Sequence, residues 1–486
     1  MRTCGILMPV FSLCSKGGIG TLGREAFSFV DFLHKAGQSW WQILPLNPTN
    51  FGDSPYQSFS SYAGNPYFID PEILIKKGLL TAEEFASFDF GDKSNEIDYE
   101  KLYNNRFKML RIAFSRFVKD KEYDAFCKEN AYWLDNYALF MSLKALNNNK
   151  SWNEWDILKL DDENELDFYR FVQFEFSKEW FALKEYANEK GIGIIGDIPI
   201  YVAYDSADVW SEPEQFQLDK DNNPSAVAGC PPDAFSDEGQ LWGNPLYNWK
   251  LMKTDGFKWW KKRLGYALKL YDTVRIDHFR GFEAYWSVPF GDETAKGGKW
   301  IKGPDMAFFR EMKKEFGDDV SIIAEDLGFL TDKVYLMLDR CGFPGMKVLQ
   351  FAFADGEDSG YLPHNYNKNC VVYTGTHDND TILGWAESLS DADLLMVKEY
   401  LNTKSDEGLN WSMIRAAQMS VADTCILTMQ DLIGLGSEGR INTPSTLGDN
   451  WKWRIGEGCV NDWLAKILYD KTKQSFRLPK TKEEQV

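Results

Sequence analysis

The chain has 486 residues, of which 44% are apolar and 15% aromatic, and its formal net charge is −19. On length alone it forms either one large barrel or two or three ordinary domains, because chains beyond about 250–300 residues rarely build a single small core. The acidic charge argues against nucleic acid or an anionic membrane as a partner. No apolar run reaches the roughly 20 residues of a membrane span, and the N-terminus lacks the apolar core of a signal peptide.

The eight cysteines are scattered and form no CxxC or Cys/His cluster. This pattern predicts reduced thiols and a cytoplasmic location. The chain has four histidines and none pair at helical spacing, so we expect neither a metal site nor a cofactor. Eighteen tryptophans are more than a core needs, and flat aromatic faces suit neutral ring-shaped ligands such as sugars.

A glycine-rich loop follows the first predicted strand. Residues 4–13 contain an apolar run, the loop at 18–23 has the pattern GxGxxG, and a helix is predicted from about Arg24. A dinucleotide site also needs an acid at the end of the next strand, but the strand at 39–46 ends in Pro-Leu-Asn-Pro. We therefore favour a tight turn over nucleotide binding for this loop.

Two long segments interrupt the predicted alternation of strands and helices. A loop rich in hydroxyl and aromatic side chains covers 50–67, and residues 72–190 are largely helical in pattern. Together they are far too long for one crossover helix, and long loops that are not simply polar are usually functional. A third strand at 191–201 carries Asp197 near its end, and an irregular segment with a predicted lid at 228–247 follows it. We interpret both segments as insertions.

The rest of the chain supplies five more strand candidates. They are short apolar runs separated by helical patterns, at 271–276, 320–328, 346–353, 370–380 and 423–431. Eight strands alternating with helices predict an α/β fold, a (β/α)₈ TIM barrel with inserted helical and irregular subdomains. We expect one catalytic barrel over 1–486, with a mostly helical insertion at about 50–190 and a lid region at about 202–250. A last helix is predicted around 463–469, and the mixed-charge tail after Lys471 is expected to fray.

Three of the predicted strands end in carboxylates. Asp277 ends the fourth strand, Glu325 lies near the end of the fifth and Asp378 near the end of the seventh. Active sites of such barrels lie at the carboxyl ends of the strands, so the three acids are expected to meet at one face. His278 and His377 stand next to two of them. One acid at a strand end is often a helix cap or an ion-pair partner, but three acids with two histidines predict a catalytic site.

Arg275 and Asp277 lie two residues apart on the fourth strand, so their side chains point to the same face. A fixed guanidinium beside a carboxylate favours the ionised form, and we expect Asp277 to be charged at neutral pH. For this pair alone, the alternative interpretation is a buried ion pair that ties the strand to its neighbours.

Six motifs together resemble one enzyme family. In chain order they are the glycine loop Gly18 to Gly23, Ser54-Pro-Tyr-Gln-Ser58, Trp242-Gly-Asn-Pro-Leu-Tyr247, Val274-Arg-Ile-Asp-His-Phe-Arg-Gly281, Ala324-Glu-Asp-Leu-Gly328 and Thr376-His-Asp-Asn379. From about residue 5 to 455 the chain is similar to the 4-alpha-glucanotransferases, also called amylomaltases or disproportionating enzymes, of the alpha-amylase clan. The resemblance implies a barrel without the C-terminal β-domain of true amylases. It also implies maltooligosaccharides and other α-1,4-glucans, such as starch or glycogen chains, as donor and acceptor.

The resemblance assigns roles to the acids and to their neighbours. It implies that Asp277 is the nucleophile, Glu325 the general acid/base and Asp378 the group that stabilises the transition state. The residues implied in substrate binding are Arg275, His278, His377, Asp197, Tyr56, Ser54 and Trp242. The predicted function is the transfer of α-1,4-glucan segments between maltooligosaccharides by a retaining double displacement.

Retaining glycosyl transfer needs two carboxyl groups about 5–5.5 Å apart, one ionised and one protonated. We expect nearby negative charge to raise the pKa of Glu325 enough for it to hold a proton. Glu325 then protonates the leaving oxygen while Asp277 attacks the anomeric carbon, and afterwards deprotonates the acceptor hydroxyl that displaces the enzyme.

Three alternatives stay open. An α-1,4-glucan hydrolase uses the same three acids with water as acceptor, and only the resemblance and the aromatic loops at 50–67 and 228–247 argue against it. A glucan-binding protein without activity is disfavoured because all three carboxylates are present. A metal-dependent lyase or isomerase would lose its activity on chelation. The sequence indicates neither the oligomeric state nor chain-length preferences, and departures from the family pattern at Phe51, Ala234 and 442–446 leave acceptor preference open.

Overall fold

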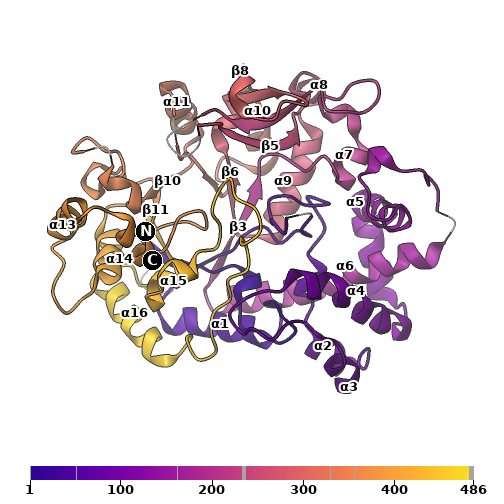
Figure 1. The fold of residues 1–486 in the computed structure, drawn as a ribbon, viewed down its shortest axis with the longest axis horizontal. Coiled ribbons are helices and arrows are strands. Elements are labelled where there is room, and N and C mark those ends of the chain that lie inside the picture. The colour runs from indigo at the N-terminus through magenta and orange to yellow at the C-terminus, as the bar shows by residue number, and fades with distance from the viewer. Residues whose placement is uncertain are drawn as a thin grey trace.

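A parallel barrel of eight strands forms the centre of the molecule (Figure 1). The structure is a computed structural model that describes residues 2–50, 52–160, 162–232, 237–328, 330–354 and 356–480; Phe51 and Ala234 lie outside this part of the chain. Neighbouring strands pair in the order β10-β11-β12-β1-β2-β3-β6-β9. The strands are β1 (Thr3–Leu7), β2 (Trp40–Gln42), β3 (Gly193–Pro199), β6 (Thr273–Asp277), β9 (Ile322–Ala324), β10 (Gly345–Val348), β11 (Cys370–Tyr373) and β12 (Thr424–Thr428).

The two ends of this sheet, β9 and β10, also approach each other. The N–H of Ala324 donates to the carbonyl oxygen of Pro344 at 3.0 Å. The N–H of Met346 donates to the carboxylate of Asp326. These bonds make the sheet a nearly closed barrel, which confirms the predicted (β/α)₈ fold.

The interior of the barrel carries polar side chains that bond to one another. Asp197 of β3 and Arg275 of β6 are directly opposite in register, so their side chains share the interior face. Tyr373 of β11 donates from its hydroxyl to Oε1 of Gln42 on β2 at 2.8 Å. All four side chains are buried, and each makes at least one hydrogen bond to a protein partner, as buried polar side chains generally do.

Helices surround the barrel and bury one face against it (Figure 1). On α1, for example, Phe29, Val30 and Leu33 are buried at helical spacing. None of the described helices is long and apolar enough to cross a membrane. The helices are α1 (Arg24–Lys35), α2 (Pro71–Lys76), α3 (Ala82–Ala86), α4 (Tyr99–Arg116), α5 (Lys121–Leu146), α6 (Glu163–Glu189), α7 (Ala207–Ser211), α8 (Trp249–Thr254), α9 (Lys258–Leu270), α10 (Met306–Phe316), α11 (Asp332–Cys341), α12 (Ile382–Ser388), α13 (Asp391–Tyr400), α14 (Leu409–Met419), α15 (Met429–Ile433) and α16 (Asp462–Gln474).

The long segment between β2 and β3 folds as α2 to α6, on the right of the barrel in Figure 1. Side-chain caps start these helices: Asp120 accepts from the N–H of Tyr123 at the start of α5, and Thr81 and Glu84 form a capping box at α3. Aromatic side chains fill the space between the helices, as where Phe117 packs on Phe171 with ring centroids 4.8 Å apart.

A second, antiparallel sheet lies at the upper edge of the barrel in Figure 1. The sequence predicts an irregular lid region at about 202–250, but β4 and β5 lie in this segment and pair into the sheet. Its strand order is β5-β4-β7-β8. The strands are β4 (Ala226–Cys230), β5 (Gln240–Pro245), β7 (Ala284–Pro289) and β8 (Lys299–Lys302). Trp242, a predicted substrate residue, therefore sits on a strand and not on an isolated loop.

Two further expectations are wrong in detail. The strand expected at 346–353 ends at Val348 and turns into a 3₁₀ helix over Leu349–Phe353, where Gln350 donates to the carbonyl oxygen of Asp380 at 2.8 Å. Up to residue 480 the C-terminal tail does not fray, because Arg477 is fully buried beyond α16; residues 481–486 lie outside the described part of the chain. Its guanidinium donates to five carbonyl oxygens, those of Thr3, Gln418, Ser420, Ala422 and Asp423.

We expect Arg477→Ala to lower the free energy of unfolding by about 2–5 kcal/mol, since the change leaves several buried carbonyl oxygens without a donor. Thermal or denaturant unfolding measures the loss. The matched control is Lys473→Ala, which removes one positive charge from the exposed face of α16 and should change stability by less than about 0.5 kcal/mol. Equal effects of the two variants would contradict the role of Arg477 as an anchor.

Candidate active site

The three acids singled out in the sequence lie at the same edge of the barrel. Asp277 is the last residue of β6, Glu325 follows the end of β9, and Asp378 lies in the loop after β11. β6 and β9 are adjacent parallel strands, so Asp277 and Glu325 are neighbours. The charge of Asp378 is close enough to raise the pKa of Asp277. The acids therefore form one cluster at the carboxyl ends of the strands.

Arg275 connects this cluster to the barrel wall. Its Nη2 donates to Oδ1 of Asp277 at 2.9 Å, and its Nη1 donates to the two oxygens of Asp197 at 2.8 and 2.7 Å. Its Nε lies 3.3 Å from Sδ of Met346. The Arg275 side chain is 3% exposed and that of Asp197 is 0% exposed. Because both ends of the guanidinium are held, Arg275 has one orientation in which it meets Asp277.

Tyr56 and His377 form an aromatic wall beside the acids. The two rings stack with centroids 5.1 Å apart at an interplanar angle of 20°, and Trp451 packs against both of them. The Tyr56 hydroxyl donates to Oδ2 of Asp197 at 2.8 Å. Ser54 accepts the N–H of Tyr56 on its hydroxyl at 3.2 Å and so shapes the turn that carries this ring. Ser54 and Asp197 thus bond to residues of this wall and of the acid cluster.

Burial raises the pKa of Asp277 above its ordinary value, and the opposing charge of Arg275 does not cancel this effect. Arg275 acts to lower the pKa of Asp277, as expected, but burial acts more strongly in the opposite direction. The Asp277 carboxylate is 31% exposed, so solvent reaches it from the open side of the cluster.

Two backbone amides hold Glu325. The N–H of Leu327 donates to Oε1 and the N–H of His278 donates to Oε2, both at 2.7 Å. Burial raises the pKa of Glu325 to about 8, and the negative charge of Asp277 adds to the shift. Negative charge was the predicted cause of this shift, whereas burial is the larger one. A carboxyl group with a pKa of about 8 is mostly protonated at neutral pH, so Glu325 can hold a proton there.

Asp378 has a different environment. Asn442 donates from Nδ2 to its Oδ1 at 2.6 Å, and Nε2 of His377 lies 3.4 Å from its Oδ2. Burial acts to raise the pKa of Asp378, but His377 and Asn442 outweigh it and lower the pKa to about 2. Burial likewise acts to lower the pKa of His377, and the charge of Asp378 turns the net shift upward. Asp378 is therefore ionised, and its side chain is 46% exposed.

His278 adopts a left-handed backbone conformation with φ 52° directly after the strand. This turn aims its N–H at Glu325, while its ring meets Trp242 edge-on with centroids 4.7 Å apart. Burial and the nearby charge of Arg280 lower the pKa of the ring to about 3. His278 is thus neutral at pH 7, whereas His377 is the histidine that favours a charge.

The residues that hold Asp378 are not among the site residues predicted from the sequence. Asn442 and Arg440 contact it from the loop after β12, and Trp451 completes the aromatic wall. Only their position in the chain indicated them: a segment that follows the eighth strand lies at the same end of the barrel as the acids. Nothing in the local pattern of that loop identified which side chains turn inward.

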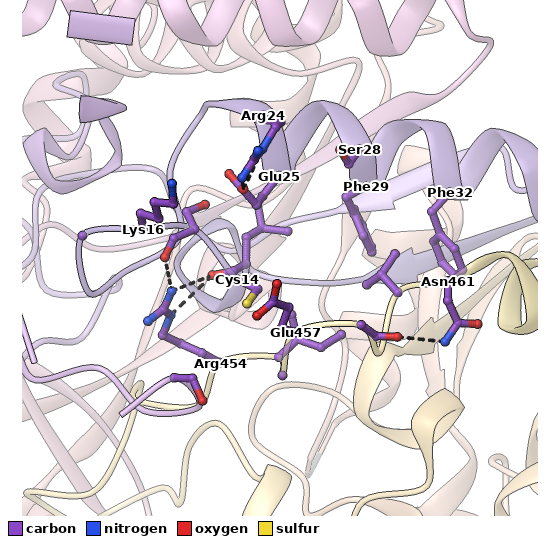
Figure 2. Close-up of a pocket in the computed structure, with 18 of the residues that line it drawn as sticks. Cys14, Lys16, Arg24, Glu25, Ser28, Phe29, Phe32, Arg454, Glu457 and Asn461 are labelled. Carbon is purple, nitrogen blue, oxygen red and sulfur yellow. Dashed lines mark hydrogen bonds and ion pairs between the residues drawn. The ribbon is translucent and has the colours of Figure 1, made fainter. Parts of the chain in front are cut away.

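A cavity of about 660 Å³ lies away from the acids, between α1 and residues 454–462 (Figure 2). Its charged groups largely satisfy one another: Arg24 pairs with Glu25 at 2.8 Å, and Arg454 donates to the carbonyl oxygens of Leu13 and Ser15. The glycine-rich loop forms part of its wall.

The glycines of that loop serve close packing within the chain itself. A Cβ on Gly20 would lie 1.8 Å from the carbonyl oxygen of Val10, and one on Gly23 would lie 2.0 Å from Oδ2 of Asp70. Asp70 thus occupies the start of α1, where a dinucleotide phosphate would bind. This packing supports the tight-turn interpretation of the GxGxxG pattern.

A parallel barrel with paired and ionised acids at its carboxyl edge is typical of enzymes that act on glycosidic bonds. A family model described as 4-alpha-glucanotransferase matches residues 8–458. The 4-alpha-glucanotransferase of Clostridium butyricum is 51% identical over 482 residues, which cover 96% of this chain and 99% of that protein. The chain belongs to the 4-alpha-glucanotransferase family and is an enzyme of this type.

Solved structures agree with this assignment. The amylomaltase from Streptococcus agalactiae in complex with acarbose matches with a TM-score of 0.95 and 40% identity, over 99% of this chain and 100% of that one. The amylomaltase from Corynebacterium glutamicum matches with a TM-score of 0.77 over 98% of this chain and 75% of that one, and at 17% identity it shows the shared fold. The resemblance drawn from the six motifs is confirmed.

The pKa of Glu325 predicts a basic limb in the pH profile. A general acid works in its protonated form, so kcat/KM should fall as pH rises through about 8. A pH series of kcat/KM on maltotriose at constant ionic strength measures this limb. A profile that stays flat from pH 6 to 10 would show that no group with this pKa delivers a proton.

Proposed function

We propose that this 4-alpha-glucanotransferase works by a retaining double displacement in which Asp277 is the nucleophile and Glu325 the general acid/base. Asp277 attacks the anomeric carbon, and Glu325 gives its proton to the oxygen of the leaving glucan. The resulting glycosyl-enzyme ester is then broken by an acceptor hydroxyl, whose proton returns to Glu325. Each cycle breaks one α-1,4 bond and makes another.

The observation that supports this proposal is the raised pKa of Glu325 beside Asp277 on the adjacent strand. Glu325 has its pKa raised to about 8 by burial, and the charge of the neighbouring Asp277 contributes to the same shift. A nucleophile must be ionised and a general acid protonated at the same pH, and this pair meets both needs.

Asp378 is proposed to stabilise the transition state. Its pKa is lowered to about 2, so it carries a full negative charge at any pH at which the enzyme works. Its exposed side chain is available to ring hydroxyls and to the positive charge that develops at the anomeric carbon.

We divide the predicted substrate-binding residues into two groups, those that contact the sugar and those that orient other side chains. Four side chains present a ring or a charged group to the acids or to one another and are assigned to the sugar itself: His278, His377, Tyr56 and Trp242. Three side chains, Arg275, Asp197 and Ser54, act through their neighbours. The guanidinium of Arg275 orients Asp277, Asp197 orients Arg275 and Tyr56, and Ser54 orients Tyr56.

α-1,4-Glucans are the proposed donors and acceptors. The names of the relatives and the acarbose complex of the S. agalactiae amylomaltase support this substrate class. The aromatic loop at 50–67 meets β5 at the site, where Nε2 of Gln57 lies 3.3 Å from the carbonyl oxygen of Trp242 and 3.1 Å from Oδ1 of Asn244. The surface that these two segments form together suits an acceptor sugar and excludes water once the sugar is bound.

The organisation and location of the protein are proposed on the same basis. The helices α2 to α6 and the strands β4 and β5 support a single catalytic barrel with the two predicted insertions, and β7 and β8 add a further segment at 284–302. Cys4, Cys341, Cys370 and Cys425 are buried thiols, which supports a cytoplasmic location.

Asp277→Asn and Glu325→Gln should each lower the turnover of maltotriose by at least about a thousandfold, because one removes the nucleophile and the other the proton donor. Initial rates on protein made in a host without its own copy of the enzyme measure the loss. Asp318→Asn is the matched control, since Asp318 is exposed at the opposite end of β9. A folded variant of either acid that keeps a tenth of the activity would show that its role is wrong.

Incubation with maltotriose should give glucose and a ladder of longer maltooligosaccharides with nearly constant total reducing ends. Transfer makes one bond for each bond it breaks, whereas hydrolysis adds a reducing end at each event. Chromatography resolves the ladder, and a reducing-sugar assay counts the ends. Trp242→Ala should increase the hydrolysed fraction, because the surface at the acceptor is opened to water. If reducing ends rise in step with glucose in the unchanged protein, it is a hydrolase.

A further inference from the structure

Asp378 is held from two sides. Within its own loop, the hydroxyl of Thr376 accepts the N–H of Asp378 at 3.3 Å. From the loop after β12, Asn442 donates from its side chain to the Asp378 carboxylate and from its backbone N–H to the carbonyl oxygen of His377 at 3.1 Å. The position of the carboxylate therefore depends on where Asn442 lies.

Arg440 binds the backbones of both Asp378 and Asn442. Its Nη2 donates to the carbonyl oxygen of Asp378 and its Nε to the carbonyl oxygen of Asn442, each at 2.9 Å. Nε and Nη2 form one edge of the planar guanidinium, so the two carbonyl groups are held at a set distance from each other. Nη1 lies 3.8 Å from Oδ2 of Asp380, which also accepts from the hydroxyl of Ser437 at 2.7 Å.

These contacts link the backbone of the acid to the backbone of the residue that orients it. Without them the segments after β11 and β12 are still joined by the contacts of Asn442 with Asp378 and His377 and of Ser437 with Asp380, but no planar group sets the distance between the backbones of Asp378 and Asn442. Misplacement of a reacting group by about 1 Å can cost a hundredfold in rate. We expect displacement of Asp378 to lower kcat more than it weakens substrate binding. The positive charge at the anomeric carbon is present in the transition state and not in the bound substrate, so a displaced carboxylate loses an interaction with the transition state alone.

We propose that Arg440 is a positioning residue that sets the carboxylate of Asp378 for the transition state. The inference rests on the proposed function, in which Asp378 stabilises that state. Arg440 touches neither the substrate nor the reacting atoms and acts through Asp378 and Asn442.

A double-mutant cycle tests this proposal. Arg440→Met and Arg440→Lys are made in the unchanged protein and in Asp378→Asn, and kcat and KM are measured with maltotriosyl fluoride, an activated donor that keeps slow variants measurable. The lysine variant keeps the charge but lacks the planar two-donor edge. The control is Arg310→Met, because Arg310 is exposed on α10 and makes no hydrogen bond or ion pair within the described residues.

In the unchanged protein we expect both Arg440 variants to lower kcat about 10–100-fold with KM within about threefold, and Arg310→Met to change neither. In Asp378→Asn the same substitutions should lower kcat by less than about threefold, since the group that Arg440 positions is already gone. Equal losses in the two backgrounds, a loss confined to KM, or full activity of Arg440→Lys would overturn the proposal.

A failure of the proposed function has a different signature. If Asp378→Asn alone keeps near-normal kcat, the role of Asp378 is wrong, whatever Arg440 does. If Arg440→Met does not fold, the double-mutant cycle is measured with Arg440→Lys, and the same changes in kcat and KM decide the outcome. Thermal unfolding of each variant separates loss of stability from loss of position, because a purely structural role would lower the melting temperature in both backgrounds and give no coupling in kcat.

Discussion

The guanidinium of Arg275 holds two carboxylates of adjacent strands inside the barrel, and the rest of the site depends on this contact. The parallel register of β3 and β6 puts Asp197 directly opposite Arg275, and the alternation of side chains puts Asp277 two residues further on the same face. Burial of such charges is costly unless each is paired and hydrogen-bonded, as Arg275 and Asp197 are here. A barrel core of this kind stabilises the fold less than an apolar one would, and it fixes the direction of Asp277.

The acids around Arg275 differ in the direction of their pKa shifts. Glu325 is buried beside the charge of Asp277 and holds a proton, whereas Asp378 is held ionised by His377 and Asn442. In the proposed mechanism Glu325 transfers the proton and Asp277 makes the covalent attack. The third acid is positioned by a different element, the loop after β12, so its geometry can change independently of the pair.

The fold and the acids could be predicted from the sequence because they leave local signals. Eight apolar runs alternate with helical patterns, and Asp277, Glu325 and Asp378 stand at the ends of three of them. The small antiparallel sheet was missed because its strands are short and pair across distant segments, as β4 does with β7. The contacts of Arg477 and Arg440 could not be predicted either. Both side chains donate to backbone carbonyl oxygens of residues far away in the sequence, and no sequence pattern marks such acceptors. The cause of the raised pKa of Glu325 also needed the structure, because burial depends on every element around the residue.

A covalent glycosyl-enzyme on Asp277 is what separates double displacement from every single-step mechanism. In Glu325→Gln, maltotriosyl fluoride can still react, because fluoride leaves without a proton, but no base remains to activate an acceptor. We predict that the variant accumulates a maltotriosyl ester, and that mass spectrometry after proteolysis finds the added mass on the peptide that contains Asp277. An unmodified enzyme after release of a full equivalent of fluoride, or the sugar on any other residue, would contradict the assignment of Asp277 as the nucleophile.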